Sequence, residues 1–221
     1  MLLQEIREEI IQYGKKAVQS GLTRGTGGNL SVCDRASGLM AITPSGIDYF
    51  EIKPEQIVLI NAQSGKIIDG DAVPSSECDM HRIFYKYRND IGAVIHTHTT
   101  FAATIATLNW TLPPLHYLVA YAGTDVRCAK YATYGTVALA KNAFEAMEGR
   151  KAVLLANHGL LAGGKDLAEA FAVTEEIEFC CELYYRAKCV GEPVLLPQDE
   201  MERMIERFKD YGRRIEEHEE I

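Results

Sequence analysis

Apolar and polar residues follow two different periods along the chain. Apolar residues recur every three to four positions, the spacing of a helix with one buried face, over 3–19, 75–87, 99–108, 136–148, 166–188 and 198–211. Short apolar runs typical of strands lie between them, at 29–33, 39–43, 57–61, 66–69, 93–98 and 152–157. Early strand pairs followed by strand–helix alternation predict a mixed α/β sheet covered by helices. No linker or repeat interrupts the pattern, so we expect a single domain over residues 1–221.

Composition and charge narrow the class of protein. Apolar residues make up 47% and charged residues 24%, as in an ordinary globular protein. No stretch approaches the roughly 20 apolar residues that cross a bilayer, and charges of both signs within the first ten positions are unlike a secretory signal. We therefore expect a cytoplasmic protein with no membrane partner. The net charge of −8 argues against nucleic acid, and six cysteines without a C-x-x-C pair indicate neither a disulfide framework nor a zinc ribbon.

Three histidines and a glutamate are candidate metal ligands. His96 and His98 alternate along a predicted strand and so project from one face, although two histidines on a half-buried strand can also be structural. His158 follows an apolar run and precedes a glycine, and Glu77 opens a predicted helix, where a carboxylate also interacts favourably with the helix dipole. Together the four predict a catalytic zinc site with an exchangeable carboxylate, while manganese or cobalt could substitute. His81 and His218 are interpreted as structural or solvated.

Three separate segments contain groups that suit an anion. The glycine-rich loop RGTGGN leads into a strand, TPSG lies at another strand end, and Ser75-Ser76 lies at a predicted helix start. Backbone N–H groups, hydroxyls and a positive helix end can bind phosphate without a cluster of basic side chains, although glycines alone can also be a flexible turn. The three segments together are therefore a candidate phosphate-binding site.

In order and spacing, GTGGNLS, ITPSGI, PSSE, HTH, YATYGT and NHGL resemble the class II aldolase family of L-fuculose-1-phosphate aldolase and L-ribulose-5-phosphate 4-epimerase. The resemblance extends almost end to end. It implies a three-layer α/β/α fold with a largely antiparallel sheet, and a homotetramer with active sites between subunits. It also implies zinc on His96, His98 and His158, with Glu77 first as a fourth ligand and then as the acid/base. The family's phosphate-binding positions are matched by Gly28, Asn29, Ser45, Gly46, Ser75 and Ser76.

The same resemblance assigns several aromatic residues. Tyr117 matches a catalytic tyrosine that reaches into a neighbouring subunit's site, and positions lining the aldehyde end are matched by Tyr134, Phe208 and Tyr211. Ser45 replaces a threonine of the fuculose enzyme and keeps the hydroxyl. Glu77 and Leu118 stand where the epimerase branch has aspartates, and leucine cannot relay a proton, so the aldolase branch is favoured.

The implied activity is retro-aldol cleavage of a deoxyketose 1-phosphate into dihydroxyacetone phosphate and a small aldehyde. L-Fuculose 1-phosphate would give lactaldehyde, and 5-deoxyribulose 1-phosphate would give acetaldehyde. Within the family, a methylthioribulose-1-phosphate dehydratase or a pentulose-phosphate 4-epimerase are the alternatives. A non-catalytic interaction module like the adducin head is the alternative of another class, and the intact histidines and glutamate argue against it.

Overall fold

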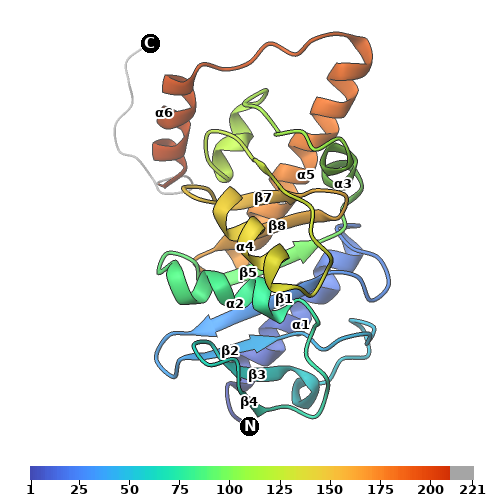
Figure 1. Cartoon of the computed structure of the whole chain (residues 1–221), viewed down its shortest axis with the longest axis vertical. Helices are drawn as coiled ribbons and strands as arrows, with labels where there is room; N and C mark the ends of the chain where they lie inside the picture. Colours follow the sequence, from blue (N-terminus) through green and yellow to red (C-terminus); the bar gives the residue numbers. More distant parts are fainter. Residues whose placement is uncertain (210–221) are drawn as a thin grey trace, which may run out of the picture.

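The computed structural model describes residues 1–209, which form one eight-stranded sheet with helices on both faces (Figure 1). The strand order is β4-β3-β2-β1-β5-β8-β7-β6, and every neighbouring pair is antiparallel except β6 and β7. The strands are β1 (Asn29–Asp34), β2 (Leu39–Ile42), β3 (Val58–Asn61), β4 (Ile67–Asp69), β5 (Ala93–Thr97), β6 (Cys128–Ala129), β7 (Ala152–Leu155) and β8 (Gly159–Gly164).

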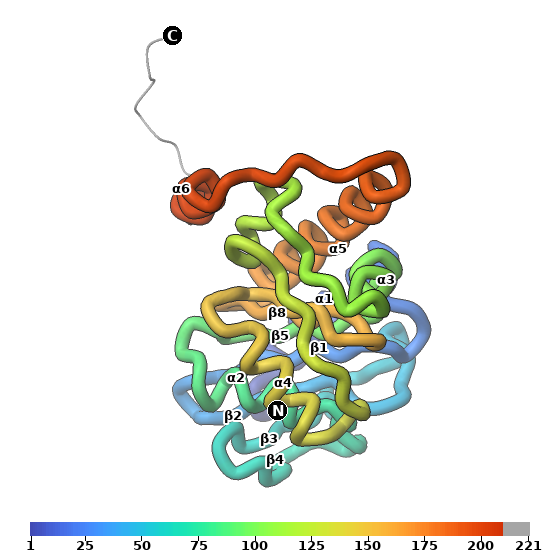
Figure 2. The backbone as a smooth tube through the Cα atoms, turned by 45° about the horizontal axis from the view of Figure 1, so that its top comes forward, coloured from blue at the N-terminus to red at the C-terminus, as the bar shows by residue number. Residues whose placement is uncertain are grey.

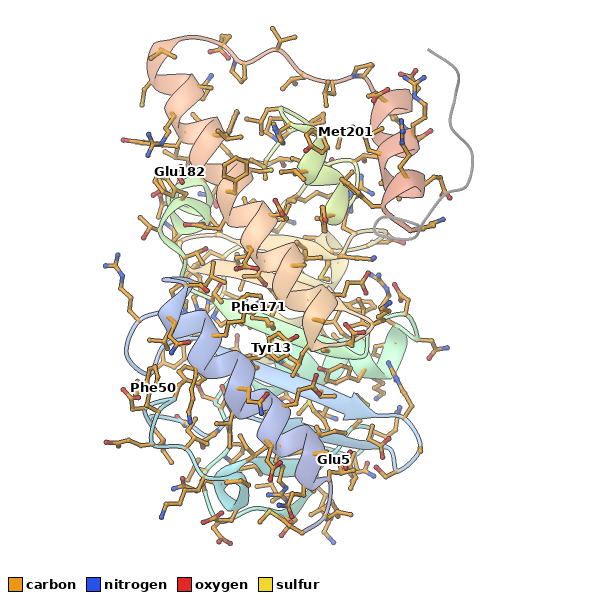
Figure 3. All side chains as sticks on the ribbon, turned by 180° about the vertical axis from the view of Figure 1, so that it is seen from behind. Glu5, Tyr13, Phe50, Phe171, Glu182 and Met201 are labelled. Carbon is orange, nitrogen blue, oxygen red and sulfur yellow. The ribbon has the colours of Figure 1, made fainter. Side chains whose placement is uncertain are left out.

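Helices cover the two faces of the sheet in separate layers. One face carries α2 (Cys78–Tyr87) and α4 (Val137–Ala146), which enclose an apolar core against the central strands. The other face carries α1 (Gln4–Gln19), α3 (Thr100–Thr107) and α5 (Leu167–Val190). Seen from that side, α1 and α5 cross the sheet side by side, and the rings of Tyr13 and Phe171 meet with centroids 5.5 Å apart (Figure 3). The predicted three-layer α/β/α fold is therefore confirmed.

The last helix lies beyond the sheet. After α5 the chain runs across one end of the molecule before α6 (Gln198–Lys209) begins (Figure 2). α6 packs against the short 3-10 helix η2 (Tyr117–Tyr121), whereas a second 3-10 helix, η1 (Pro54–Gln56), precedes β3. The helix predicted over 198–211 is thus described as far as Lys209, and its final two positions lie outside the described residues. No described helix is long and apolar enough to cross a membrane.

Two strands, the two-residue β6 and the longer β8, were not predicted from the sequence. β8 contains three glycines, which disfavour a strand by propensity, yet it is fully buried between β5 and β7. Packing requires glycine at its last position, because a Cβ on Gly164 would lie 2.5 Å from the backbone nitrogen of Ala170 in α5. Close approach of that helix, rather than strand propensity, selects the glycine.

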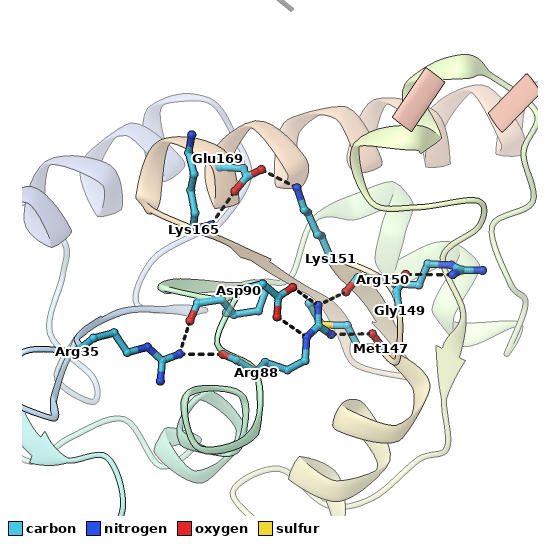
Figure 4. Close-up of polar contacts among 10 residues, drawn as sticks. Arg35, Arg88, Asp90, Met147, Gly149, Arg150, Lys151, Lys165 and Glu169 are labelled. Carbon is cyan, nitrogen blue, oxygen red and sulfur yellow. Dashed lines mark hydrogen bonds and ion pairs between the residues drawn. The ribbon is translucent and has the colours of Figure 1, made fainter. Parts of the chain in front are cut away.

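Polar contacts connect the layers near the start of β5 (Figure 4). Arg88 forms an ion pair with Asp90 and donates to the backbone carbonyls of Met147 and Arg150, at 3.3 and 3.2 Å. Lys151, just before β7, pairs with Glu169 of α5 at 2.6 Å. These contacts anchor the end of β5 from which the strand runs toward His96.

Candidate active site

Pairing of β5 with β8 brings the three predicted histidines together. His96 lies in β5 opposite Leu161, His98 follows the end of β5, and His158 lies in the three-residue connection between β7 and β8. One ring nitrogen from each histidine lies within 4.8 Å of the others. The connection passes so close to β5 that a Cβ on Gly159 would lie 2.3 Å from the carbonyl oxygen of Thr97, so only glycine fits after His158.

Hydrogen bonding and burial prepare these rings to bind a cation. The Nδ1 of His96 donates to the carbonyl oxygen of Leu160 at 2.9 Å, which leaves the Nε2 lone pair directed toward the cluster. That Nε2 lies 3.0 Å from the Nε2 of His98. Burial, followed by the neighbouring His158, lowers the pKa of both His96 and His98. The rings are therefore held neutral, the form in which an imidazole binds a metal.

Glu77 completes the cluster from another element. It occupies the N-cap position of α2, just before the helix rather than inside its first turn as predicted, and is only 7% exposed. Its Oε2 lies 3.4 Å from His96 Nε2, and its Oε1 lies 3.6 Å from His158 Nε2. Oε1 is buried without a hydrogen-bond partner among the described residues. Because three imidazoles and a buried carboxylate are a typical donor set, the residues fit a divalent transition-metal ion.

A cavity of about 430 Å³ opens beside the histidines. All six predicted phosphate-binding residues line it, together with Glu77, His98 and His158. None of the lining residues in the described chain is a lysine or an arginine, so an anion would be bound by hydroxyls and amides. The glycine loop passes so close to β5 that a Cβ on Gly28 would lie 2.5 Å from the carbonyl oxygen of His96. Gly28 also has a φ of 71°, in the left-handed region that favours glycine.

The predicted aromatic residues lie in different places. Tyr134 lines the cavity and is 68% exposed. Tyr117 is 46% exposed on η2 and does not line it, and Phe208 packs with a ring-centroid distance of 4.5 Å against Tyr121. Tyr211 lies outside the described residues. Within the described part of one chain, the metal and phosphate residues are therefore together, and Tyr117 and Phe208 are apart from them.

Several residues were missed by the sequence reasoning. Thr26, Tyr131 and Asn157 also line the cavity, and Asn157 has a left-handed backbone with a φ of 54°. An asparagine directly before His158 was an available signal, because asparagine tolerates this conformation in turns. His81 is fully buried, which agrees with the structural and not with the solvated interpretation, and it contacts Asn29, a residue of the cavity wall. His218 lies outside the described residues.

The arrangement combines a three-histidine cluster that could hold a metal ion, a buried carboxylate with one oxygen that lacks a hydrogen-bond partner among the described residues, and a cavity lined by glycines and serines without basic side chains. A ketose phosphate could place its phosphate among the glycines and serines and its carbonyl beside the imidazoles. Such a site can polarise a carbonyl and move a proton at the neighbouring carbon.

Comparison with known proteins agrees with this arrangement. Residues 8–185 match the family described as Class II Aldolase and Adducin N-terminal domain. The chain is 57% identical over 212 residues to 5-deoxy-D-ribulose 1-phosphate aldolase of Bacillus thuringiensis serovar kurstaki, covering 96% of this chain and 99% of that protein. It is 38% identical to L-fuculose phosphate aldolase of Escherichia coli K12, covering 96% and 98%.

Solved structures extend the likeness to three dimensions. An L-fuculose 1-phosphate aldolase superposes with a TM-score of 0.92 at 56% identity, covering 95% of this chain and 98% of that one. The family match over most of the chain, the enzyme relatives and the three-histidine cluster all indicate the same class of protein. This chain therefore belongs to the class II aldolase and adducin N-terminal domain family, and within it to the class II aldolases, lyases that break a carbon–carbon bond.

Proposed function

We propose that the protein cleaves 5-deoxyribulose 1-phosphate between C3 and C4, giving dihydroxyacetone phosphate and acetaldehyde. The observation that carries the proposal is the adjacency of the three-histidine cluster and Glu77 to a cavity lined by glycines and serines. The 57% identity to a 5-deoxy-D-ribulose 1-phosphate aldolase supports this choice of substrate.

His96, His98 and His158 would hold the metal, with zinc as the proposed ion because imidazole nitrogen and carboxylate oxygen suit it. When bound, the ion would supply a Lewis acid that polarises the C2 carbonyl and stabilises negative charge developing on the enediolate. The same ligands also suit manganese or cobalt, so metal substitution should retain part of the activity.

The phosphate would bind among Gly28, Asn29, Ser45, Gly46, Ser75 and Ser76. Ser75 Oγ accepts a hydrogen bond from the backbone N–H of Glu77 at 3.3 Å, which leaves its hydroxyl hydrogen for an anion. The start of α2 adds a positive helix end to the same wall. Because Glu77 follows Ser75 and Ser76 directly, a phosphate bound there brings the sugar's C3 close to the Glu77 carboxylate.

Two residues would divide the proton transfers. Tyr117 of a neighbouring subunit would accept the C4 hydroxyl proton as the C3–C4 bond breaks and the aldehyde departs. Glu77 would then deliver a proton to C3, through the oxygen that has no hydrogen-bond partner, and dihydroxyacetone phosphate results. The exposure of Tyr117 and its distance from the cavity in one chain support a homotetramer in which subunits complete one another's sites. The aldehyde would be positioned by Tyr134, Phe208 and Tyr211. We place the enzyme in the cytoplasm.

L-Fuculose 1-phosphate is the second candidate substrate, because the superposed structure at 56% identity is an L-fuculose 1-phosphate aldolase. 5-Methylthioribulose 1-phosphate is the third ketose phosphate to assay. A relative in Rhodospirillum rubrum, 43% identical over 208 residues, is a 5-methylthioribulose-1-phosphate/5-deoxyribulose-1-phosphate aldolase. That relative covers 94% of this chain and 92% of its own length.

The test is an assay of the purified, metal-loaded protein with 5-deoxyribulose, L-fuculose and 5-methylthioribulose 1-phosphates. Both dihydroxyacetone phosphate and the released aldehyde are measured. We expect the highest kcat/KM with 5-deoxyribulose 1-phosphate. A higher value with fuculose 1-phosphate would select the second candidate. Release of water or formation of an epimer, without dihydroxyacetone phosphate, would overturn aldolase activity in favour of a dehydratase or an epimerase.

A further inference from the structure

A continuous line of polar side chains runs inward from Glu77 through the core. Along α2 its members are Glu77, His81 and Tyr85, spaced four apart and so on one face of the helix. Along β1 they are Asn29 and Ser31, spaced two apart and so on one face of the strand. All five are buried, with exposed fractions of 7% or less. We call these five residues the polar seam.

Hydrogen bonds join the seam from end to end. Asn29 Nδ2 donates to Glu77 Oε2 at 3.0 Å, and Asn29 Oδ1 contacts His81 Nε2. On the other side of the ring, His81 Nδ1 lies 2.6 Å from Ser31 Oγ. Ser31 Oγ lies 2.7 Å from the Tyr85 hydroxyl, which donates to the backbone carbonyl of Ser31 at 2.9 Å. Every link is therefore within hydrogen-bonding distance.

The seam is unusual because the layer around it is apolar. Met80 and Phe84 of α2, together with Met40 and Val94 of the sheet, are fully or nearly fully buried in the same core cluster. Burying a polar group costs free energy, and apolar replacements of similar shape can be neutral or stabilising. Stability alone therefore does not explain why five polar side chains lie here in a line that ends on Glu77.

The donors and acceptors can be assigned in one direction. A carboxylate only accepts, so Asn29 must turn its NH₂ toward Glu77 and its Oδ1 toward His81. Oδ1 only accepts, so His81 must carry a hydrogen on Nε2. Nδ1 of the neutral ring then accepts the hydrogen of the Ser31 hydroxyl, and the single Tyr85 hydrogen is shared between the hydroxyl and carbonyl oxygens of Ser31. The ring is then neutral with its hydrogen on Nε2, in keeping with burial, which lowers the pKa of His81 to about 3.

We propose that His81 is a positioning residue: by donating from Nε2 to Asn29 Oδ1, it holds the Asn29 amide in the orientation that donates to Glu77 Oε2. This inference rests on the proposed role of Glu77 in proton transfer. With Oε2 held by Asn29, the unpartnered Oε1 is the oxygen that exchanges the proton with C3. An Asn29 amide turned by 180° would instead present a carbonyl oxygen to the carboxylate, and the carboxylate would lose its fixed position.

The first test needs neither metal nor substrate. Nitrogen-15 NMR of the metal-free protein, labelled at histidine, reports which ring nitrogen of His81 carries the hydrogen, and the spectrum of His81→Gln assigns the signals. We expect a neutral ring with hydrogen on Nε2 near pH 7. A ring with hydrogen on Nδ1, or on both nitrogens, would overturn the assigned direction and with it the proposal.

The second test separates positioning from packing. Glutamine can accept from Ser31 through its oxygen and donate to Asn29 through its nitrogen, whereas leucine can do neither. In the metal-loaded enzyme we expect His81→Leu to slow exchange of the C3 proton of dihydroxyacetone phosphate with solvent about 10- to 100-fold. His81→Gln should recover most of that loss, and metal content should be unchanged in both variants.

Thr174→Val is the matched control, because it removes one buried hydroxyl whose bond goes to Ala170 at 2.8 Å, on α5 and away from the seam. Losses in His81→Leu no larger than those in Thr174→Val, or equal losses in the leucine and glutamine variants, would reject positioning. Should His81→Leu not fold, Ser31→Ala removes the donor to Nδ1 and is expected to lower the exchange rate while Thr174→Val does not; an unchanged rate would reject the proposal.

Failure of the proposed function would give different results from failure of the inference about His81. A wild-type enzyme that cleaves none of the three ketose phosphates would refute that function, while the NMR measurement would still decide the orientation of the seam. Cleavage by the wild type at full rate, with an exchange rate insensitive to His81, would leave the function standing and refute only the inference.

Discussion

The two halves of the candidate site are built in different ways. The proposed metal and phosphate half is assembled inside one chain from β1, β5, the β7–β8 connection and the start of α2. Its His96 and Glu77 are buried, whereas His158 is partly buried and His98 is exposed. The aldehyde half, as predicted, depends on Tyr117 on η2, on Phe208 of α6 and on Tyr134, of which Tyr117 and Tyr134 are half to two-thirds exposed. In the first half the predicted residues are gathered within one chain; in the second, Tyr134 lines the cavity while Tyr117 and Phe208 lie apart from it.

This difference indicates what each half contributes. Buried groups on paired strands are held in position by the core, which suits a metal and the carbon that changes bonding. An exposed Tyr134 beside the cavity, with Tyr117 and Phe208 apart from it in one chain, suits the proposal that a second subunit completes this part of the site. We therefore expect changes in the first half to remove chemistry, and changes in the second to alter rate and substrate preference.

The largest expected effect comes from the metal cluster. His96→Ala should abolish retention of about one divalent ion per chain and lower cleavage by on the order of a thousandfold or more, because a Lewis acid contributes several kcal/mol. Metal analysis and steady-state kinetics measure both quantities. Chelation of the wild type should have the same effect, and readdition of zinc should reverse it. Full activity of the metal-free protein would contradict a catalytic role for a metal bound by the three histidines.

The next effect distinguishes the two proton-transfer residues. Glu77→Gln should keep the fold but lose C3 proton exchange, whereas Tyr117→Phe should keep exchange and slow cleavage, each by about 10²- to 10⁴-fold. Mixing the two variants under conditions that allow subunit exchange should recover part of the cleavage, because some mixed interfaces contain both intact groups. Absence of recovery, despite exchange shown by mass spectrometry, would place Tyr117 outside the neighbouring site.

A smaller effect is expected in the phosphate cradle. Ser76→Ala removes one hydroxyl from the cavity wall and should weaken binding of the ketose 1-phosphate about 10- to 100-fold, since hydrogen bonds to charged groups contribute about 1.5–3 kcal/mol. Binding of the unphosphorylated ketose should be unaffected. Calorimetry with both sugars measures the difference, and Ser64→Ala, on an exposed turn, is the control. Equal weakening for both sugars would place the phosphate elsewhere.

The smallest expected effect is on the pH dependence of the free energy of unfolding, through the buried His81. Burial lowers the pKa of His81 to about 3, compared with about 6.5 in an unfolded chain, so the unfolded state binds more protons between these values. The free energy of unfolding of the metal-free protein should therefore fall as the pH decreases through that range. His81 contributes at most about 1.4 kcal/mol per pH unit. Denaturant titrations of wild type and His81→Gln should show a shallower decrease in the variant; identical slopes would contradict a buried neutral ring.

Much of the fold could be predicted because it rests on local periodicity. The helix predicted over 3–19 is observed as α1, and the turn within NAQSGK connects β3 to β4. β8 escaped prediction because its glycines are selected by close contacts with other elements: Gly159 with β5, Gly163 with Ile91 and Met147, and Gly164 with α5. Likewise, the helix predicted over 75–87 placed Glu77 in its first turn, whereas α2 begins at Cys78 and Glu77 is its N-cap, because propensity does not define the N-cap.

For the site, the sequence by itself determined the chemistry available: alternating histidines on a strand, a histidine before a glycine, a carboxylate beside two serines, and glycines leading into a strand. Tertiary structure alone decided which of these groups meet. Pairing of β5 with β8 brings His158 to His96, and packing of α2 against β1 connects His81 to Asn29 and so to Glu77. Periodicity specifies which face a side chain occupies, whereas the partner across that face lies tens of residues away and is selected by the packing of the whole core.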